Sequence, residues 1–154
     1  IESNPEAVKV VADIMKLFKN VKTIIFDLRE NTGGSPNMVQ LISSYLFDEQ
    51  PVHLNSLYFR TTNSETEFWT LAEIEGKRYP DVKVFLLTSR TTFSAAEEFA
   101  YNLQCLKRAT LIGEVTGGGA HPGDFHLIQG QFALFVPSGR AINPITKTNW
   151  EGTG

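Results

Sequence analysis

Hydrophobic residues recur three or four positions apart in three segments of the chain, which is the spacing of one face of an α-helix. These segments are residues 5–20, 38–47 and 94–106. The first has a sound start, because Asn4 can cap the helix and Pro5 suits its first turn. Three short apolar runs rich in β-branched residues predict buried strands. The runs are residues 23–28, 82–88 and 110–114.

The stretches between these elements alternate in polarity or carry turn residues. Residues 52–62 alternate and predict an extended hairpin arm, and a second hairpin is expected for 125–128 with 131–136. We expect residues 65–79, which are polar with aromatic islands, to be irregular. After a turn at 137–139 we expect only loop.

Strands and helices alternate along the chain, which favours an α/β fold with a mainly parallel sheet and right-handed crossovers. In such sheets, ligands bind beyond the carboxyl ends of the strands. The loops that follow residues 23–28 and 82–88 are rich in Gly or Ser and would lie at that edge. The sequence therefore places a candidate site in these two loops.

The composition fits one ordinary domain, with 154 residues of which 42% are hydrophobic. Charged residues make up 20% and the net charge is −3, which argues against a nucleic-acid partner. The apolar runs are far too short to cross a bilayer, so we expect no integral membrane protein in this segment. A single cysteine, Cys105, excludes a disulfide within the chain.

Ser94 follows the second of these strands and opens a predicted helix in the run Ser94-Ala95-Ala96-Glu97. A helix N-terminus offers free backbone N–H groups and positive partial charge, which can hold the oxyanion of a tetrahedral intermediate. One interpretation of Ser94 is therefore a nucleophile. The other is an ordinary capping box, with serine at the cap and glutamate three residues later. Spacing alone favours the cap.

The loop after the first strand carries Asn31, Gly33 and Gly34. Paired glycines permit positive φ and a close approach of the backbone to a ligand, and successive N–H groups can form an anion-binding nest. A plain turn explains the same residues equally well. The triple glycine at 117–119 is a weaker signal, because glycine loops are common.

Four motifs stand in a fixed order along the chain: Asp27-Leu28-Arg29-x-Asn31-x-Gly33-Gly34, Thr92-x-Ser94-Ala95-Ala96-Glu97, Gly113-Glu114-x-Thr116-x-Gly118-Gly119 and Trp150-Glu151-Gly152. Together they resemble the tail-specific, or C-terminal processing, serine peptidase family. Residues 54–70 and 150–152 resemble in particular the branch of the interphotoreceptor retinoid-binding protein domains and the tricorn protease core. The resemblance implies a ClpP/crotonase-like core of ββα units with an added hairpin arm.

The resemblance also assigns roles to individual positions. Ser94 matches the family's nucleophile, and the backbone N–H groups of Ala95 and of Gly33 or Gly34 match its oxyanion hole. Glu151 falls in the closing motif, where the tricorn-like branch has a carboxylate that supports its catalytic histidine.

The source of the general base departs from the family pattern. One branch activates its serine with a lysine, but the aligned position here is Gly119. The tricorn-like branch uses a histidine upstream of this region. The general base of this protein could therefore lie outside the given chain. Within the chain, His121 follows the triple glycine and is our candidate for the base or a substrate contact. We expect His53 to be exposed in the arm and His126 to lie on a strand face.

We therefore predict a serine-type peptidase that forms an acyl-enzyme on Ser94 and acts on peptide or protein substrates without a cofactor. No two histidines have zinc-like spacing near a carboxylate, so we predict no metal. The alternative is a binding module for a hydrophobic ligand, like the retinoid-binding relatives. An acyl-CoA enzyme of the crotonase type ranks below both.

The organisation of the whole protein follows mainly from the resemblance. We expect residues 1–154 to be the catalytic core domain of a longer protein, because both ends of the chain look cut. The family implies export to the periplasm or outside the cell, although no signal peptide is visible in this segment. The sequence leaves open whether the protein forms a homo-oligomer and whether this chain is active alone.

Overall fold

A computed structural model describes residues 4–154, and its helices begin where the sequence offers a cap. The Asn4 side chain accepts a hydrogen bond from the Glu6 N–H at 3.0 Å, and Ser35 caps the second helix in the same way. A proline follows each of these two caps, where its missing N–H costs nothing. The helices are α1 (Pro5–Lys16), α2 (Pro36–Ser44) and α3 (Ala95–Cys105).

The strands of the described residues form three sheets. The first, sheet A, is parallel in the order β1-β4-β5, and the second, sheet B, is antiparallel in the order β3-β2-β8. The third is the hairpin β6-β7. The strands are β1 (Thr23–Asp27), β2 (His53–Phe59), β3 (Ser64–Trp69), β4 (Lys83–Thr88), β5 (Thr110–Gly113), β6 (Gly123–Ile128), β7 (Phe132–Pro137) and β8 (Gly139–Ile142).

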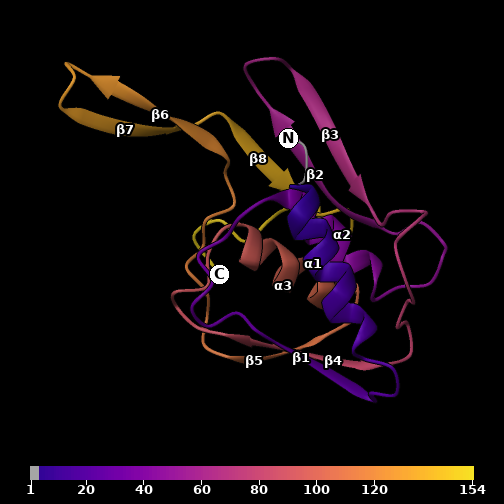
Figure 1. The fold of residues 1–154 in the computed structure, drawn as a ribbon. Helices are drawn as coiled ribbons and strands as arrows, with labels where there is room; N and C mark the ends of the chain where they lie inside the picture. The colour runs from indigo at the N-terminus through magenta and orange to yellow at the C-terminus, as the bar shows by residue number, and fades with distance from the viewer. Residues whose placement is uncertain (1–3) are drawn as a thin grey trace.

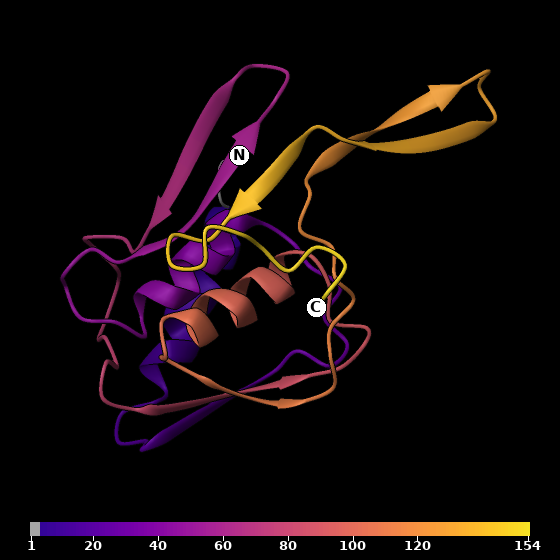
Figure 2. The same cartoon turned by 180° about the vertical axis from the view of Figure 1, so that it is seen from behind.

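The helices lie between sheets A and B, so the molecule has three layers (Figure 1). The main core fills the space between sheet A and the helices, where Ile24, Leu86 and Leu103 are fully or almost fully buried. Tyr79 joins this core and donates its hydroxyl hydrogen bond to the Met15 carbonyl oxygen at 2.7 Å. The hairpin β6-β7 projects away from all three layers, as both views show (Figure 2).

The predicted α/β class with a mainly parallel sheet is confirmed for sheet A, but two strands were missed. The expectation that residues 65–79 are irregular is wrong for β3, which pairs with β2 as the outer strand of the arm. The loop expected after 137–139 is also interrupted, because β8 pairs with the other edge of β2. Sheet B therefore joins segments more than eighty residues apart, which local patterns do not reveal.

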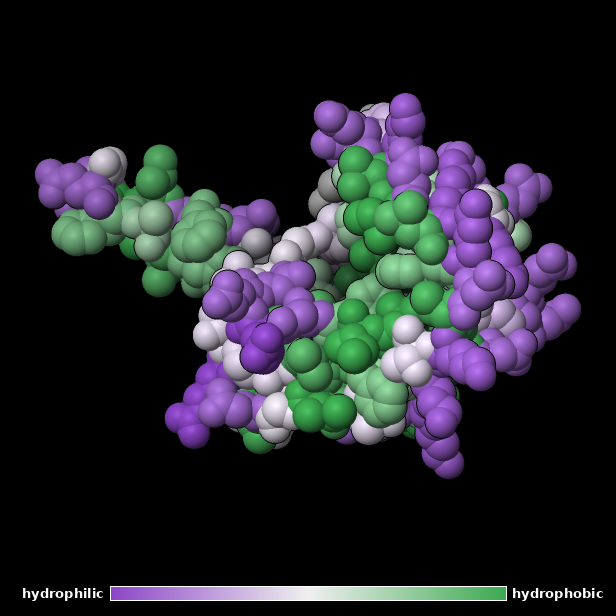
Figure 3. Space-filling view, turned by 60° about the horizontal axis from the view of Figure 1, so that its bottom comes forward, coloured by the Kyte–Doolittle hydropathy of each residue, from purple (hydrophilic) through white to green (hydrophobic). Residues whose placement is uncertain are grey.

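Two apolar surfaces stay open to solvent in the described chain. Both faces of the β6-β7 hairpin are exposed, with Phe125 and Leu127 among the most accessible large side chains. On sheet A, Ile25 of β1 and Ile112 of β5 are exposed. Figure 3, in which the bottom of the Figure 1 view is turned forward, shows a hydrophobic region on the surface of the molecule. Within residues 4–154, no helix has both the length and the apolar character needed to cross a membrane.

Candidate active site

The two loops predicted to meet at the carboxyl edge of sheet A do meet there. β1 and β4 are in register, with Asp27 opposite Leu87, so both loops leave the sheet side by side. Thr92 in the second loop donates its hydroxyl hydrogen bond to the Leu28 carbonyl oxygen at 2.7 Å. The Phe93 N–H donates to the carbonyl oxygen of Asn31 in the first loop at 3.0 Å. These bonds fix the residue that follows, which is Ser94.

Ser94 has a strained backbone, with φ 54° and ψ −123°. Residues other than glycine rarely adopt positive φ, and such strain costs about 1–3 kcal/mol. The surrounding structure holds this conformation, because the Ser94 N–H donates to Glu97 Oε2 at 2.8 Å just before α3 begins. A serine on a sharp, strained turn from strand to helix presents its hydroxyl at the edge of the sheet, as hydrolase nucleophiles do.

Gly33 and Gly34 lie across from Ser94, and they differ in what their N–H groups do. The Gly33 N–H donates to the Asn31 side-chain oxygen at 2.9 Å and is therefore occupied. Gly34 lines the same hollow as Ser94 and Ala95. Among residues 4–154, neither the Gly34 N–H nor the Ala95 N–H donates to another group, so these two are the amides available to an oxyanion. Of the two predicted glycines, the geometry favours Gly34.

Glu97 joins the Ser94 turn to the triple-glycine loop. Its carboxylate is almost completely buried and accepts hydrogen bonds from the Gly118 N–H at 2.6 Å and the Gly119 N–H at 2.9 Å. The Thr116 hydroxyl donates to the same carboxylate at 2.6 Å. With the bond from Ser94, four donors surround this one side chain. The sequence predicted a capping glutamate here, but not its bonds to a loop twenty residues away.

The triple-glycine loop packs where side chains do not fit. A Cβ on Gly119 would lie 2.1 Å from a ring carbon of Phe93, and a Cβ on Gly117 would lie 2.6 Å from the same ring. The position aligned with the lysine of the Ser-Lys branch therefore leaves no room for one. The Trp150 indole donates to the Gly119 carbonyl oxygen at 3.0 Å, which ties the closing motif to this loop.

A hollow of about 650 Å³ opens beside Ser94, and we call it the Ser94 cleft. The predicted site residues Gly34, Ala95, His121 and Glu151 line it together with Ser94. Its other walls are largely apolar and come from sheet B, the hairpin and the loops around Ser94. They include Phe93, Leu57 of β2, Ala141 of β8, Trp150, and the hairpin residues Phe125 and Phe135. Ser94 itself is half-buried, so its hydroxyl is neither in the packed interior nor on the open surface.

His121 and Glu151 are neighbours in this cleft. The His121 Nδ1 lies 3.8 Å from Glu151 Oε2, an ion-pair distance that is too long for a direct hydrogen bond. The same carboxylate oxygen accepts a hydrogen bond from the Ala120 N–H at 2.7 Å, which holds Glu151 beside the histidine.

The other two histidines lie away from the cleft. His53 stacks on the Trp69 ring with centroids 4.4 Å apart and is half-buried, so the prediction of an exposed arm residue is wrong. His126 is exposed on strand β6, on a strand face as predicted. Among the described residues, no group of three or more His, Cys, Asp or Glu side chains is placed to hold a metal.

Glu98 was not among the predicted site residues, but it also lines the Ser94 cleft. Burial raises the pKa of its carboxyl from an ordinary 4.5 to about 7, and the neighbouring Asn55 side chain opposes this rise. Only 4% of Glu98 is exposed, yet its Oε1 has no hydrogen-bond partner in the described chain. The only signal in the sequence is that Glu98 lies in the first turn of the helix that Ser94 precedes.

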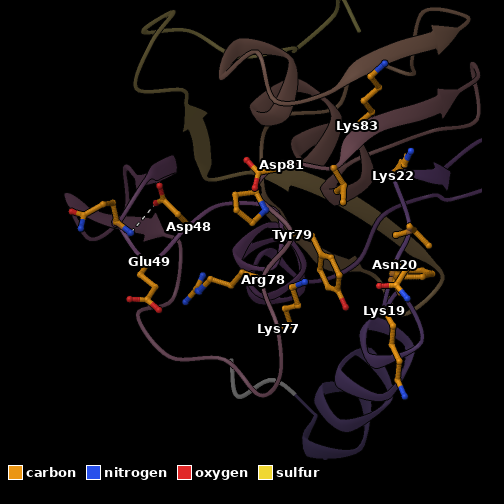
Figure 4. A pocket seen from close by; sticks show the side chains of 15 residues that line it. Lys19, Asn20, Lys22, Asp48, Glu49, Lys77, Arg78, Tyr79, Asp81 and Lys83 are labelled. Atoms are coloured by element: carbon orange, nitrogen blue, oxygen red, sulfur yellow. Dashed lines mark hydrogen bonds between the residues drawn. The ribbon is translucent and has the colours of Figure 1, made fainter.

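A larger hollow than the Ser94 cleft lies elsewhere. It measures about 1010 Å³ and is lined by residues 18–22, which follow α1, and by residues 48–50 and 77–83. Its charged side chains are of both signs and include Lys19, Lys83 and Asp81 (Figure 4). Ser94 is not among its lining residues. The larger hollow therefore lacks the features that define the candidate site, because the strained serine and the free amides all lie at the smaller cleft.

The family of the chain follows from its sequence. Residues 2–154 match the family model described as Peptidase family S41. This match extends over nearly the whole chain and includes the strained Ser94 turn, the glycine loops and the closing motif. The chain belongs to peptidase family S41, and the predicted resemblance to tail-specific, C-terminal processing peptidases is confirmed.

Solved structures of low identity share the fold. The photosystem II D1 C-terminal processing protease aligns with a TM-score of 0.72 at 18% identity, over 96% of this chain and 37% of its own. Mature CPAF aligns with a TM-score of 0.78 at 14% identity, over 100% of this chain and 42% of its own. A lipoprotein from Streptococcus agalactiae gives 0.67 at 18%, over 97% of this chain and 55% of its own. This chain therefore spans about two fifths to one half of the length of these proteins.

Proposed function

We propose that the protein is a serine-type peptidase that hydrolyses peptide bonds through an acyl-enzyme on Ser94. The observation that carries the proposal is the strained backbone of Ser94, held at a strand-to-helix turn beside a cleft. The unoccupied N–H groups of Gly34 and Ala95 line the same cleft. Membership of peptidase family S41 supports the reaction class.

In the acylation step, Ser94 Oγ attacks the carbonyl carbon of the substrate peptide, and its proton passes to a general base. The carbonyl oxygen becomes an oxyanion, which the Gly34 and Ala95 N–H groups stabilise. The base then returns the proton to the leaving nitrogen, the C–N bond breaks, and the acyl group stays on Ser94. Water attacks the ester in the second half of the reaction and regenerates the serine. No step requires a cofactor.

His121 is the base we assign within this chain. Among residues 4–154 it is the histidine that lines the Ser94 cleft, and Glu151 lies 3.8 Å from its Nδ1. A small movement would close this gap, and catalytic hydrogen bonds are often long before substrate binds. Glu151 would then orient the ring and stabilise the imidazolium, as the carboxylate of a Ser-His-Asp triad does. The rival source is a histidine from another part of the full-length protein.

We further propose that this chain is the catalytic core domain of a longer, exported protein with a ClpP/crotonase-like fold. The parallel sheet of the described residues supports the core assignment, and so do aligned structures about twice as long or longer. The lipoprotein among these structures supports export. The domain prediction covers residues 1–154, of which 1–3 lie outside the described residues.

Peptide hydrolysis by the full-length protein and two variants tests the proposal. Ser94→Ala should reduce kcat/KM by a factor of about 10³ or more, because the nucleophile is lost. His121→Ala should cause a loss of similar size, whereas unchanged activity would move the base to another segment. The alternative is a binding module, which does not explain the strained serine. It would be favoured if the wild-type protein bound a retinoid in the cleft and hydrolysed no peptide.

A further inference from the structure

We infer that Glu98 and Asn55 form the floor of a substrate subsite that accepts a basic side chain, lysine or arginine, next to the scissile bond. This inference rests on the proposed peptidase function and adds a substrate preference to it. It starts from Glu98, a buried carboxyl that lines the Ser94 cleft, and from Asn55, a buried amide next to Glu98. Each has side-chain polar atoms without a hydrogen-bond partner among the described residues.

Glu98 lies close to the reacting serine in the fold. Ser94 is the N-cap of α3, Glu98 belongs to the first turn of that helix, and both residues line the Ser94 cleft. Asn55 belongs to β2 in sheet B and lies behind Glu98, close enough to affect its carboxyl. A side chain adjacent to the scissile bond that enters the cleft can therefore reach Glu98, with Asn55 next to it.

Unpaired polar atoms, two of them acceptors, define the chemistry of the missing partner. Glu98 Oε1 and both amide atoms of Asn55 are buried and have no hydrogen-bond partner among the described residues. Asn55 lies near enough to affect the Glu98 carboxyl, but no pair of atoms between them has full hydrogen-bond geometry. Leaving such groups unpaired destabilises a protein, and a ligand that supplies donors recovers that free energy. An ammonium or guanidinium carries several donors and no acceptor, so it matches Glu98 Oε1 and Asn55 Oδ1.

The walls above this floor match the rest of a basic side chain. Ala95, Leu57 and Trp150 line the cleft with apolar surface, against which a lysine or arginine stem can pack. The charged end would then meet Glu98 at the bottom. A cation would also hold that carboxyl in its ionised form. An apolar side chain of the same length would fill the walls and leave the acceptors unpaired.

The test compares pairs of peptides in which one residue is either lysine or norleucine, so that the two members of a pair differ only in the ammonium group. Internally quenched peptides carry lysine or norleucine at each residue flanking the scissile bond, and kcat/KM is measured with the full-length protein at about pH 8. At one of the two positions, lysine should be preferred over norleucine by about 10- to 100-fold. Glu98→Gln should remove most of this ratio, and the matched control Glu65→Gln, an exposed acid on β3, should keep it. A ratio near one in the wild type, or one that survives Glu98→Gln, overturns the inference.

Binding separates this inference from the proposed reaction. The same peptides are titrated into full-length Ser94→Ala by fluorescence anisotropy. Tighter binding of the lysine peptide supports the subsite even if the wild type cleaves nothing, in which case only the proposed function fails. If the peptides are cleaved and bound with no preference for lysine, the proposed subsite is wrong and the proposed peptidase function still stands.

A wild-type pH series covers the case in which Glu98→Gln does not fold. The lysine-to-norleucine ratio should rise as the pH increases through about 7, because the ionised carboxylate binds the cation. The other titratable groups near this place are His121 and Glu151 in the cleft, Glu97 beside it in α3 and His53 on β2. Their effect on the chemical step is common to both peptides and cancels in the ratio. A charge on His121 acts on the lysine peptide alone, so the series is repeated as peptide binding to Ser94→Ala with and without His121→Ala, and the rise should persist in both. A lysine-to-norleucine ratio that stays constant across this pH range would contradict the proposal that Glu98 binds the cation.

Discussion

Gly33 packs directly against Ser94. A Cβ added to Gly33 would lie 2.7 Å from Ser94 Cβ, closer than real Cβ atoms approach other atoms, and 3.2 Å from Ser94 Oγ, which is a tight contact. Gly33 also has φ 118°, a conformation that favours glycine. The glycine loop therefore forms the wall against which the serine is placed, while its neighbour Gly34 offers the free amide.

Gly33→Ala should impair catalysis because the new methyl group displaces Ser94. A misplacement of about 1 Å at a reacting group can cost roughly 100-fold in rate, so we expect a loss of that size in kcat/KM. The control is Gly130→Ala in the hairpin turn, which has φ 70° and nothing within 4 Å of the added Cβ. It shares the backbone strain of about 1 kcal/mol without touching the serine. Equal activity of the two variants would contradict the claim that Gly33 positions Ser94.

Glu97→Gln should loosen the Ser94 turn and the triple-glycine loop together. The amide keeps the shape of the side chain, but it replaces one acceptor oxygen with a donor that faces other N–H groups. We expect a loss of roughly 2–4 kcal/mol in unfolding free energy, together with lower activity. Urea unfolding and peptide hydrolysis measure both. Glu6→Gln, in the exposed first turn of α1, should change neither.

Local patterns predicted the parts of the site that lie close together in sequence. Spacing alone could not distinguish a cap from a nucleophile at Ser94, because the same four residues serve both descriptions. The structure shows that Glu97 accepts the Ser94 N–H bond of a cap while Ser94 adopts a strained turn beside the cleft. The cap and the nucleophile are therefore compatible interpretations. The nucleophile was favoured only because the four motifs resemble the peptidase family.

Long-range pairing explains what the sequence did not predict. Glu98 is buried next to Asn55, which lies more than forty residues earlier in the chain. From sequence alone, a glutamate in a first helical turn suggests an exposed charge. Strand β3 is mostly exposed and polar, so its alternation carries no core signal. Strand β8 has four residues and is defined by its partner β2 rather than by its own pattern.

Glu98 should make stability depend on pH in an unusual direction. Its pKa of about 7 in the folded protein lies above the ordinary 4.5, so the folded state retains a proton that the unfolded state releases between these values. This contribution is complete below about pH 4.5 and is lost as the pH rises through about 7, by on the order of 3 kcal/mol. Asp27, whose pKa Arg29 lowers to about 2, acts in a separate, more acidic range.

Glu98→Gln isolates this effect, because glutamine cannot ionise. The difference in unfolding free energy between variant and wild type should shift in favour of the variant from about pH 5 to about pH 8. Urea titrations of both full-length proteins at the two pH values provide the measurement. A difference that is the same at both would mean that the Glu98 pKa is close to its ordinary value.

The most direct test of the whole account is to find which residue a serine-directed reagent modifies. The full-length protein is treated with a fluorophosphonate and digested, and the adduct is located by mass spectrometry. We expect a single adduct on the peptide that contains Ser94, and none in Ser94→Ala. An adduct on another serine, or none from a preparation that cleaves peptides, would contradict the assignment of Ser94 as the nucleophile.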